Sequence, residues 1–92
     1  MIMSFLCKDT RMFYEDGVTR RFSAISKVAA RKLAMLDAAV SLSDLRIPPS
    51  NCLEALSGDR AGQYSIRVNA QFRLCFRWKD GNAYDVEIVD YH

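Results

Sequence analysis

The fold is decided by residues 58–92, which read GDRAGQYSIRVNAQFRLCFRWKDGNAYDVEIVDYH. Within this stretch, three segments alternate apolar with polar side chains: 64–68, 72–78 and 84–89. The connection between the last two contains Asp80-Gly81, a pair typical of the tight turn of a β-hairpin. The stretch therefore predicts a meander of three antiparallel strands.

The alternation also assigns the two faces of this meander, because residues two apart on a strand share a face. In segment 72–78 the apolar set is Phe72, Leu74, Phe76 and Trp78. The polar set of the meander includes Arg67, Arg73, Cys75 and Arg77. The aromatic row could be mistaken for a base-stacking surface, but its place opposite the arginines indicates core beneath the helices.

Length and composition indicate one globular domain spanning residues 1–92, with half of the residues apolar and about a quarter charged. No apolar run reaches the roughly 20 residues that cross a bilayer, and the start of the chain lacks the features of a secretory signal. The cysteines are scattered without a CxxC pair, which argues against a disulfide framework or a zinc site: Cys7, Cys52 and Cys75. We therefore expect a cytoplasmic protein with no membrane partner.

The net charge of +2 is too small to demand a polyanionic partner. Residues 1–47 carry eight basic and five acidic side chains, whereas residues 48–92 carry five and six. The excess positive charge thus lies in the first half, which permits nucleic-acid binding without requiring it.

Two helices are expected in the first half of the chain. Asp9 is placed to cap a short helix over 10–16, which Gly17 would end and which Met12 and Phe13 would anchor. A longer helix starts at Ser23 or Ser26, and its apolar stripe is Ile25, Ala29, Leu33, Leu36 and Val40.

The basic residues of the longer helix have two interpretations. Lys27 and Arg31 fall on its outer face, and Arg20 and Arg21 precede it. These four charges are either a solvated surface or a basic stripe that follows a phosphate backbone.

The remaining segments complete the predicted fold. Residues 2–7 have the composition of an added strand of the sheet, and 42–47 form a loop or helical turn that Pro48-Pro49 ends. Residues 51–56 read as a strand with Leu53 and Leu56 pointing inward. The order β-α-α-β-β-β-β, with both helices on one face of an antiparallel sheet, is an α+β fold.

The string LSGDRAGQYSIRVNAQFRLCFRW, the following Asp-Gly pair and the terminal VDYH resemble the HigB-type toxins of bacterial toxin–antitoxin pairs, part of the wider RelE/ParE-like group. The resemblance extends to the RKLAMLDAA helix and the LRIPP loop. It implies a RelE-like fold with a curved antiparallel sheet and two helices. It also implies cleavage of messenger RNA on the ribosome, which inhibits translation and growth.

The same resemblance implies partners. A helix-turn-helix antitoxin of the HigA type would neutralise the toxin, and operator DNA would be contacted only through the complex with that antitoxin. Ribosome and messenger RNA are the implied targets.

Metal-free RNA cleavage uses the substrate's own 2′-hydroxyl as the nucleophile. It requires a group that takes the 2′-proton, positive charge beside the phosphorane oxygens and an acid for the departing 5′-oxygen. The sequence contains no HExxH, Cys/His cluster, GxSxG or phosphate-binding glycine loop, so no metal or cofactor is predicted.

Arg73 is the first candidate for the positive charge, since it lies mid-strand on the polar face and a guanidinium pairs bidentately with phosphate. By residue type alone it would be a surface arginine paired with Glu87 or Asp85. The resemblance to the toxins favours the phosphate clamp.

The C-terminal residues supply the next candidates. His92 is the only histidine, and its imidazole can donate or accept a proton near neutral pH. The resemblance assigns His92 and Tyr91 to the active site, where Tyr91 could stack on a base or hold the message. Asp90 would either orient His92 or simply end the last strand.

Two positions depart from the toxin pattern. Many of the similar toxins carry a histidine and a lysine where this chain has Glu54 and Ser57. Glu54 could act as a base if an arginine compensates its charge, but Ser57 cannot replace a lysine. We therefore expect a slower nuclease, in which Arg60 and Arg77 supply positive charge for RNA binding, together with the helix residues Lys27 and Arg31.

Two further functions are compatible with the same fold. A ParE-like toxin would bind DNA gyrase without cleaving RNA, although the terminal Asp-Tyr-His has no evident purpose there. A binding module would use the basic helix face to contact nucleic acid in a repressor complex.

Overall fold

A computed structural model of the chain describes residues 1–90. Its four strands form one antiparallel sheet in the order β1-β2-β3-β4, with bounds Glu54–Ala55, Tyr64–Arg67, Phe72–Lys79 and Asn82–Asp90. Two α-helices precede them, α1 (Lys8–Asp16) and α2 (Ser26–Ala38). The α+β class and the antiparallel meander predicted from the sequence are confirmed.

The hairpin between β3 and β4 forms where the Asp-Gly pair predicted it. Lys79 pairs with Asn82, and the two residues between them have positive φ values, 52° at Asp80 and 79° at Gly81. Positive φ at both central residues is the geometry of a type I′ turn, which matches the twist of the flanking strands. The turn therefore fixes the register of the last two strands.

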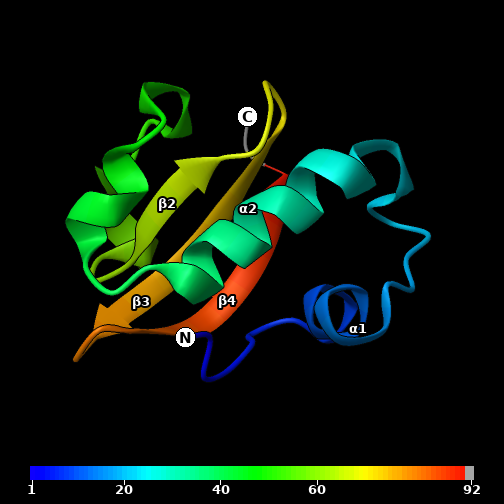
Figure 1. The fold of residues 1–92 in the computed structure, drawn as a ribbon, viewed down its shortest axis with the longest axis horizontal. Helices are drawn as coiled ribbons and strands as arrows, with labels where there is room; N and C mark the ends of the chain where they lie inside the picture. Colours follow the sequence, from blue (N-terminus) through cyan, green and yellow to red (C-terminus); the bar gives the residue numbers. More distant parts are fainter. Residues whose placement is uncertain (91–92) are drawn as a thin grey trace.

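The apolar face of the sheet packs against α2, which lies in front of the strands in Figure 1. Buried side chains of the helix and of the strands form one cluster: Ala29, Leu33, Leu36, Ile66, Leu74, Phe76, Val86 and Ile88. Phe72 and Trp78 are partly buried against this cluster, so the aromatic row is core, as the alternation predicted. At the end of the predicted helical stripe, Val40 is 77% exposed, because α2 stops at Ala38 and Ala39 takes the buried position instead.

Helix α1 closes the core at the β4 edge of the sheet. The Ile88 N–H donates a hydrogen bond to Thr10 Oγ1 at 3.1 Å, and both residues are buried. Phe13 continues the core through Phe22, whose ring centroid lies 6.2 Å away. Gly17 ends the helix with φ 70°, as predicted.

The predicted cap of α1 is wrong. The helix starts at Lys8, and Cys7 holds the N-cap position without a capping hydrogen bond from its side chain. Asp9 lies in the first turn, where its carboxylate is 3.5 Å from the Arg21 guanidinium. A carboxylate in the first turn still favours the helix through the dipole.

The segment predicted as a first strand joins the sheet only at two points. Ile2 and Phe5 form isolated parallel bridges with Ala83 and Val86 on the outer edge of β4. The predicted strand over 51–56 is likewise shorter than expected, since β1 contains two residues. Neither helix within residues 1–90 is long and apolar enough to cross a membrane.

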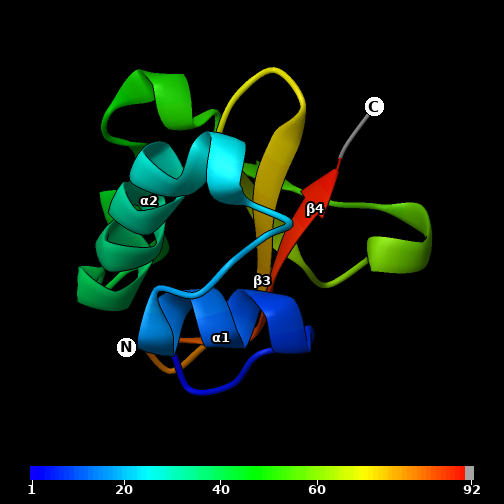
Figure 2. The same ribbon diagram turned by 90° about the vertical axis from the view of Figure 1, so that its right-hand side faces the viewer.

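Short 3₁₀ turns connect these elements: η1 (Ser23–Ile25), η2 (Leu42–Arg46), η3 (Pro49–Asn51) and η4 (Gly58–Arg60). Figure 2 shows the η4 segment on the opposite side of the sheet from α2. This leaves the polar face of the sheet covered only in part, by the loop between β1 and β2.

Candidate active site

Cross-strand pairing brings the candidate residues of the polar face into rows. One row crosses all four strands: Glu54, Ser65, Cys75 and Glu87. The adjacent row contains Arg67, Arg73 and Val89. Paired residues of neighbouring strands project to the same side of a sheet, so these two rows form one charged surface.

Within residues 1–90, Ser65, Cys52 and Glu54 contact the Arg73 guanidinium. Its Nε donates a hydrogen bond to Ser65 Oγ, and its Nη2 donates one to the Cys52 carbonyl, both at 2.8 Å. The Glu54 carboxylate lies 3.8 Å from the same Nη2. Only 14% of the Arg73 side chain is exposed, so the guanidinium is an oriented cation rather than a freely moving surface charge.

The pairing expected for an ordinary surface arginine is wrong. Glu87 lies 3.3 Å from Arg60, and Asp85 lies 3.5 Å from Arg77. Among residues 1–90, the carboxylate that forms an ion pair with Arg73 is that of Glu54, which lies on β1 and is 50% exposed. Glu54 therefore has the compensating arginine that a carboxylate near a phosphate requires.

Arg67 is the direct cross-strand partner of Arg73. Like charges in this position destabilise a sheet. An anion that binds between the two guanidinium groups would relieve this repulsion, which favours phosphate binding at this point of the surface.

Arg60 reaches the same face from η4. Its Nη1 donates hydrogen bonds to Gln63 Oε1 at 3.1 Å and to Glu87 Oε1 at 3.3 Å. Beneath this group, Cys75 is fully buried, and desolvation raises the pKa of its thiol. Arg60 thus has a structural role, and Cys75 is a buried thiol rather than a nucleophile.

The C-terminal candidates lie at the end of β4. Asp90 pairs with Phe72 and accepts a hydrogen bond from the Gln71 side chain at 3.0 Å, so it contributes to the end of the sheet. The strand register sets Asp90 on the side of Phe72, whereas Arg73 projects to the other side. Tyr91 and His92 lie outside the described residues.

The two basic residues of α2 lie far from this surface. Lys27 and Arg31 are exposed on the side of the helix that faces away from the sheet. The helix and the sheet therefore separate them from Arg73, and these two groups of charges cannot contact one phosphate.

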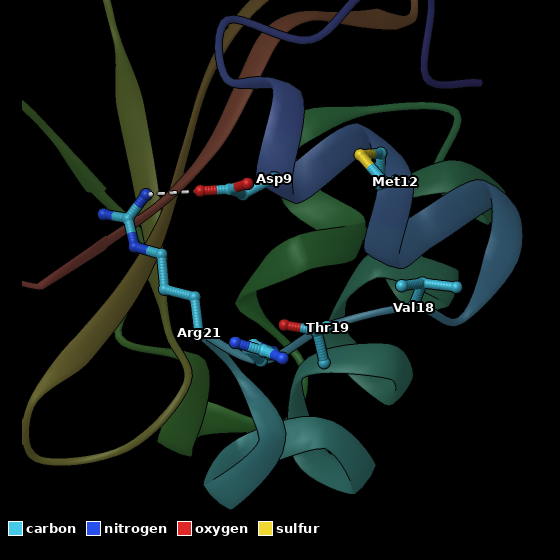
Figure 3. A pocket seen from close by; sticks show the side chains of 6 residues that line it. Asp9, Met12, Val18, Thr19 and Arg21 are labelled. Atoms are coloured by element: carbon cyan, nitrogen blue, oxygen red, sulfur yellow. Dashed lines mark hydrogen bonds and ion pairs between the residues drawn. The ribbon is translucent and has the colours of Figure 1, made fainter.

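The arginines before α2 line a different hollow, of about 380 Å³, between α1 and residues 18–21 (Figure 3). The Arg21 guanidinium closes it through the ion pair with Asp9 and lies 5.1 Å from the Phe22 ring centroid. The other walls include Met12 and Val18. Arg21 is thus occupied in joining the two helices.

The positioning of Cys52 is a feature that sequence reasoning missed. The Cys52 backbone has a left-handed conformation, φ 48°, which turns its carbonyl toward Arg73. Next to it, the fully buried Asn51 accepts a 2.5 Å hydrogen bond from Lys32 Nζ and donates to the Leu45 carbonyl. Desolvation is the larger cause that lowers the pKa of Lys32, and the positive charge of Arg31 is the second.

Among residues 1–90, no three His, Cys, Asp or Glu side chains are close enough to hold a metal ion.

Two solved structures share this fold. A chain of the YoeB–YefM complex from Staphylococcus aureus aligns with a TM-score of 0.60 at 18% identity, covering 100% of this chain and 98% of that one. The YoeB dimer from the same organism aligns with a TM-score of 0.56, also at 18% identity, covering 99% and 97%. At such low identity these likenesses concern the fold alone, and they confirm its RelE-like class.

The sequence comparisons are closer. Toxin HigB-1 of Vibrio cholerae is 49% identical over 85 residues, 90% of each chain, and the endoribonuclease HigB of Proteus vulgaris is 35% identical over the whole of both chains. These matches give no support to the ParE-like alternative. Residues 3–92 match the family described as the RelE-like toxin of the type II toxin–antitoxin system HigB. Because the match covers nearly the whole sequence, the chain belongs to the HigB-like toxins, which are RelE-like toxins of type II toxin–antitoxin systems.

Proposed function

We propose that this toxin is an endoribonuclease that cuts messenger RNA on the ribosome without a metal or cofactor. The observation that carries the proposal is the surface formed by Arg73, Arg67 and Glu54, which combines a fixed cation, a second cation and an exposed carboxylate. The relative named endoribonuclease HigB, which aligns over its full length, supports the same chemistry.

In the proposed reaction the 2′-oxygen of the substrate attacks the adjacent phosphorus. The new bond to the 2′-oxygen closes a cyclic phosphate, and the bond to the 5′-oxygen breaks. Arg73 stabilises the negative charge that develops on the phosphorane, and its fixed orientation avoids reorganisation during the reaction. Glu54 takes the 2′-proton as a base.

The departing 5′-oxygen needs a proton. We assign its donation to His92, the only histidine of the chain. Tyr91 holds the message by stacking on a base. Val89 is the cross-strand partner of Arg73. In the sequence, Tyr91 follows Val89 by two positions and His92 follows it by three. Asp90 would then orient His92 in addition to ending β4.

The proposed rate is lower than that of toxins with a histidine and a lysine at the positions of Glu54 and Ser57. The negative charge of a carboxylate is repelled by the substrate phosphate, whereas an imidazole is not, and Ser57 adds no positive charge. Arg60 and Arg77 supply part of the missing positive potential from the same face of the sheet.

As a type II toxin, the protein has an antitoxin partner. We propose that this antitoxin is a helix-turn-helix protein of the HigA type and that the toxin reaches operator DNA only within their complex. The proposed site of action is the cytoplasm, where the ribosome presents the message.

The test uses the purified toxin, programmed ribosomes and a labelled message. Cuts that appear with the wild-type chain and disappear in an Arg73→Ala/His92→Ala double variant support the proposal. An intact message at high toxin concentration, or full cleavage by the double variant, overturns it. Circular dichroism of the variant provides the control for folding.

A further inference from the structure

A second hollow lies on the polar face, further along β3 from Arg73. It has a volume of about 500 Å³ and is lined by Gly62, Arg77, Trp78, Lys79 and Tyr84. Arg77 and Lys79 alternate with the apolar residues of β3, so both project to the same face as Arg73. Tyr84 is the cross-strand partner of Arg77. The Tyr84 ring therefore lines the same hollow as two cations.

A β-bulge in β4 lies next to this hollow. The register of β3 and β4 shifts between Cys75 and Arg77, and the extra residue, Asp85, has a positive φ of 52°. The Asp85 N–H donates to Ser4 Oγ at 2.9 Å, which ties this β-bulge to the N-terminal segment. Bulges of this kind redirect neighbouring side chains and are frequent next to functional sites.

Arg77 has Asp85 on one side and Gly62 on the other. Its Nε lies 3.5 Å from the Asp85 carboxylate, and its Nη1 lies over Gly62, where a Cβ would approach it to 2.7 Å. A Cβ at this position would displace the end of the Arg77 side chain, and the positive φ of 92° at Gly62 also favours glycine. The Asp85 carboxylate neutralises the charge of Arg77, so Lys79 gives the hollow a net positive charge.

We propose that this hollow is a subsite for a nucleotide of single-stranded RNA, in which Tyr84 stacks on the base and Lys79 and Arg77 bind the flanking phosphates. A ring that shares a hollow with two cations matches the chemistry of a nucleotide, which combines a planar base with an anion. The inference rests on the proposed cleavage of messenger RNA on the same face.

The spacing relates the subsite to the reacting phosphate. Arg77 follows Arg73 by four positions along β3, which corresponds to about 13 Å. A few nucleotides of an extended RNA strand span that length. The subsite therefore binds a nucleotide away from the cut, and its loss changes RNA binding rather than the chemical step.

The binding test uses a fluorescent heptanucleotide whose riboses are all 2′-O-methylated, so that it cannot be cleaved. Tyr84→Leu should weaken binding about tenfold, the size of one base–aromatic stack, whereas Tyr84→Phe keeps the ring and should bind like wild type. Lys79→Gln should reduce the slope of log K against log salt by about 0.7. Lys8→Gln, an equal loss of charge on α1, should leave binding unchanged.

Absence of heptanucleotide binding by the wild-type chain overturns the subsite, as does equal binding by Tyr84→Leu and Tyr84→Phe. If Tyr84→Leu weakens the complex with the antitoxin but not RNA binding, the hollow is a protein contact and the proposal is wrong.

Cleavage on programmed ribosomes separates this inference from the proposed function. Tyr84→Leu should raise KM about tenfold without a change in kcat. A wild-type chain that binds the heptanucleotide through Tyr84 yet cuts no message refutes the nuclease but not the subsite. Cleavage with an unchanged KM in Tyr84→Leu refutes the subsite alone.

Discussion

At the scale of single residues, the guanidinium of Arg73 combines charge with fixed orientation. The hydroxyl of the fully buried Ser65 and the Cys52 carbonyl accept hydrogen bonds from two N–H groups of Arg73 and so fix the orientation of its guanidinium. Such hydrogen bonds with a charged donor are shorter and stronger than neutral ones. The arginine therefore contributes both to the stability of the polar face and to its electrostatics.

Replacement of Arg73 separates these two contributions. Arg73→Ala should reduce cleavage by about 10²- to 10³-fold, the usual effect of removing one group that stabilises transition-state charge. It should also lower the free energy of unfolding by about 1–3 kcal/mol, because the buried Ser65 hydroxyl loses its donor. Urea unfolding and message cleavage measure the two effects.

Ser65→Ala is the matched control for that experiment, since it removes one hydrogen bond and leaves the charge. It should retain most of the cleavage activity. A loss of activity in Ser65→Ala as large as in Arg73→Ala would show that packing, not the guanidinium charge, limits the reaction.

A second residue effect concerns Asp44, which caps the η2 turn. Its Oδ2 accepts hydrogen bonds from the Val40 N–H at 2.9 Å and from the Ser41 N–H at 3.2 Å. These bonds, that of Val40 first, lower the pKa of Asp44 in the folded protein. A lowered folded pKa means that the ionised form stabilises the native state, so this contribution is present above the unfolded pKa and is lost as pH falls through the folded one.

Asp44→Ala should therefore lower Tm at neutral pH. The difference from wild type should shrink once pH falls below about 3.9, the ordinary pKa of an aspartate. Asp44→Asn keeps an acceptor oxygen but should lose the pH dependence. Thermal unfolding followed by circular dichroism between pH 7 and pH 2 checks both variants, and a constant difference across that range would contradict the prediction.

At the scale of secondary-structure elements, α2 and the loop after it are joined by a buried polar contact. Lys32 is 7% exposed and Asn51 is fully buried, and their hydrogen bond links the helix to the segment that orients Cys52. The Asn51 amide also donates to the carbonyls of Leu45 and Ile47. This contact positions the loop against β2 and β3.

Loss of this contact should disturb the site without touching it. Asn51→Ala should lower the free energy of unfolding by about 3 kcal/mol, because it leaves a buried ammonium and two carbonyls without partners. The Cys52 carbonyl should then hold Arg73 less firmly, so kcat should fall more than KM rises. Both quantities are measured at a temperature where urea titration shows the variant to be folded.

Lys32→Met keeps the length of the side chain and removes the charge, which makes it the matched variant. Its stability relative to wild type should depend on pH, since the pKa of Lys32 is lowered in the folded state. Wild-type stability gains from deprotonation of Lys32 as pH rises from the folded pKa toward the unfolded value of about 10.4, so the difference should shift in favour of wild type across that window. An unchanged difference would argue against a buried charged lysine.

The elements themselves were predictable because their signals are local. The alternation in 72–78 and the Asp-Gly turn indicated β3, β4 and their polar face, and the apolar spacing indicated α2 up to Leu36. Lys32 was not recognised as buried, because its environment depends on the η3 turn, whose contact with the helix is not encoded in any local pattern.

In the candidate site, too, only the features with a local sequence signal were predictable. Strand alternation assigned Arg73 to the polar face. It could not predict the hydrogen bond from Arg73 to the Cys52 carbonyl, because that contact depends on the left-handed backbone of Cys52. The partner of Arg73 was also missed, since a two-residue β1 strand gives no periodic signal and its pairing with β2 is what brings Glu54 within 3.8 Å. The alternation in 84–89 groups Tyr84 with the apolar residues. The bulge at Asp85 instead places Tyr84 opposite Arg77, on the polar face.

At the scale of the whole molecule, the positive charges are divided between two opposite sides. The polar face of the sheet carries Arg67, Arg73 and Arg77, whereas Lys27 and Arg31 lie on the outer side of α2. The hydrophobic core lies between these two sides. A short single strand of RNA can therefore contact only one of them, and the helix side is available for another phosphate backbone, such as ribosomal RNA.

This division predicts two different salt dependences. For a non-cleavable RNA heptamer, each phosphate contact contributes about 0.7 to the slope of log K against log salt. Arg67→Gln should reduce that slope by about this amount, whereas a Lys27→Gln/Arg31→Gln variant should leave it unchanged. On programmed ribosomes, the helix variant should instead raise KM for cleavage, and the increase should disappear at high salt because the lost attraction is screened there. A helix variant that reduces the slope for the free heptamer would place the message on α2, and one that changes neither assay would leave Lys27 and Arg31 as solvated charges.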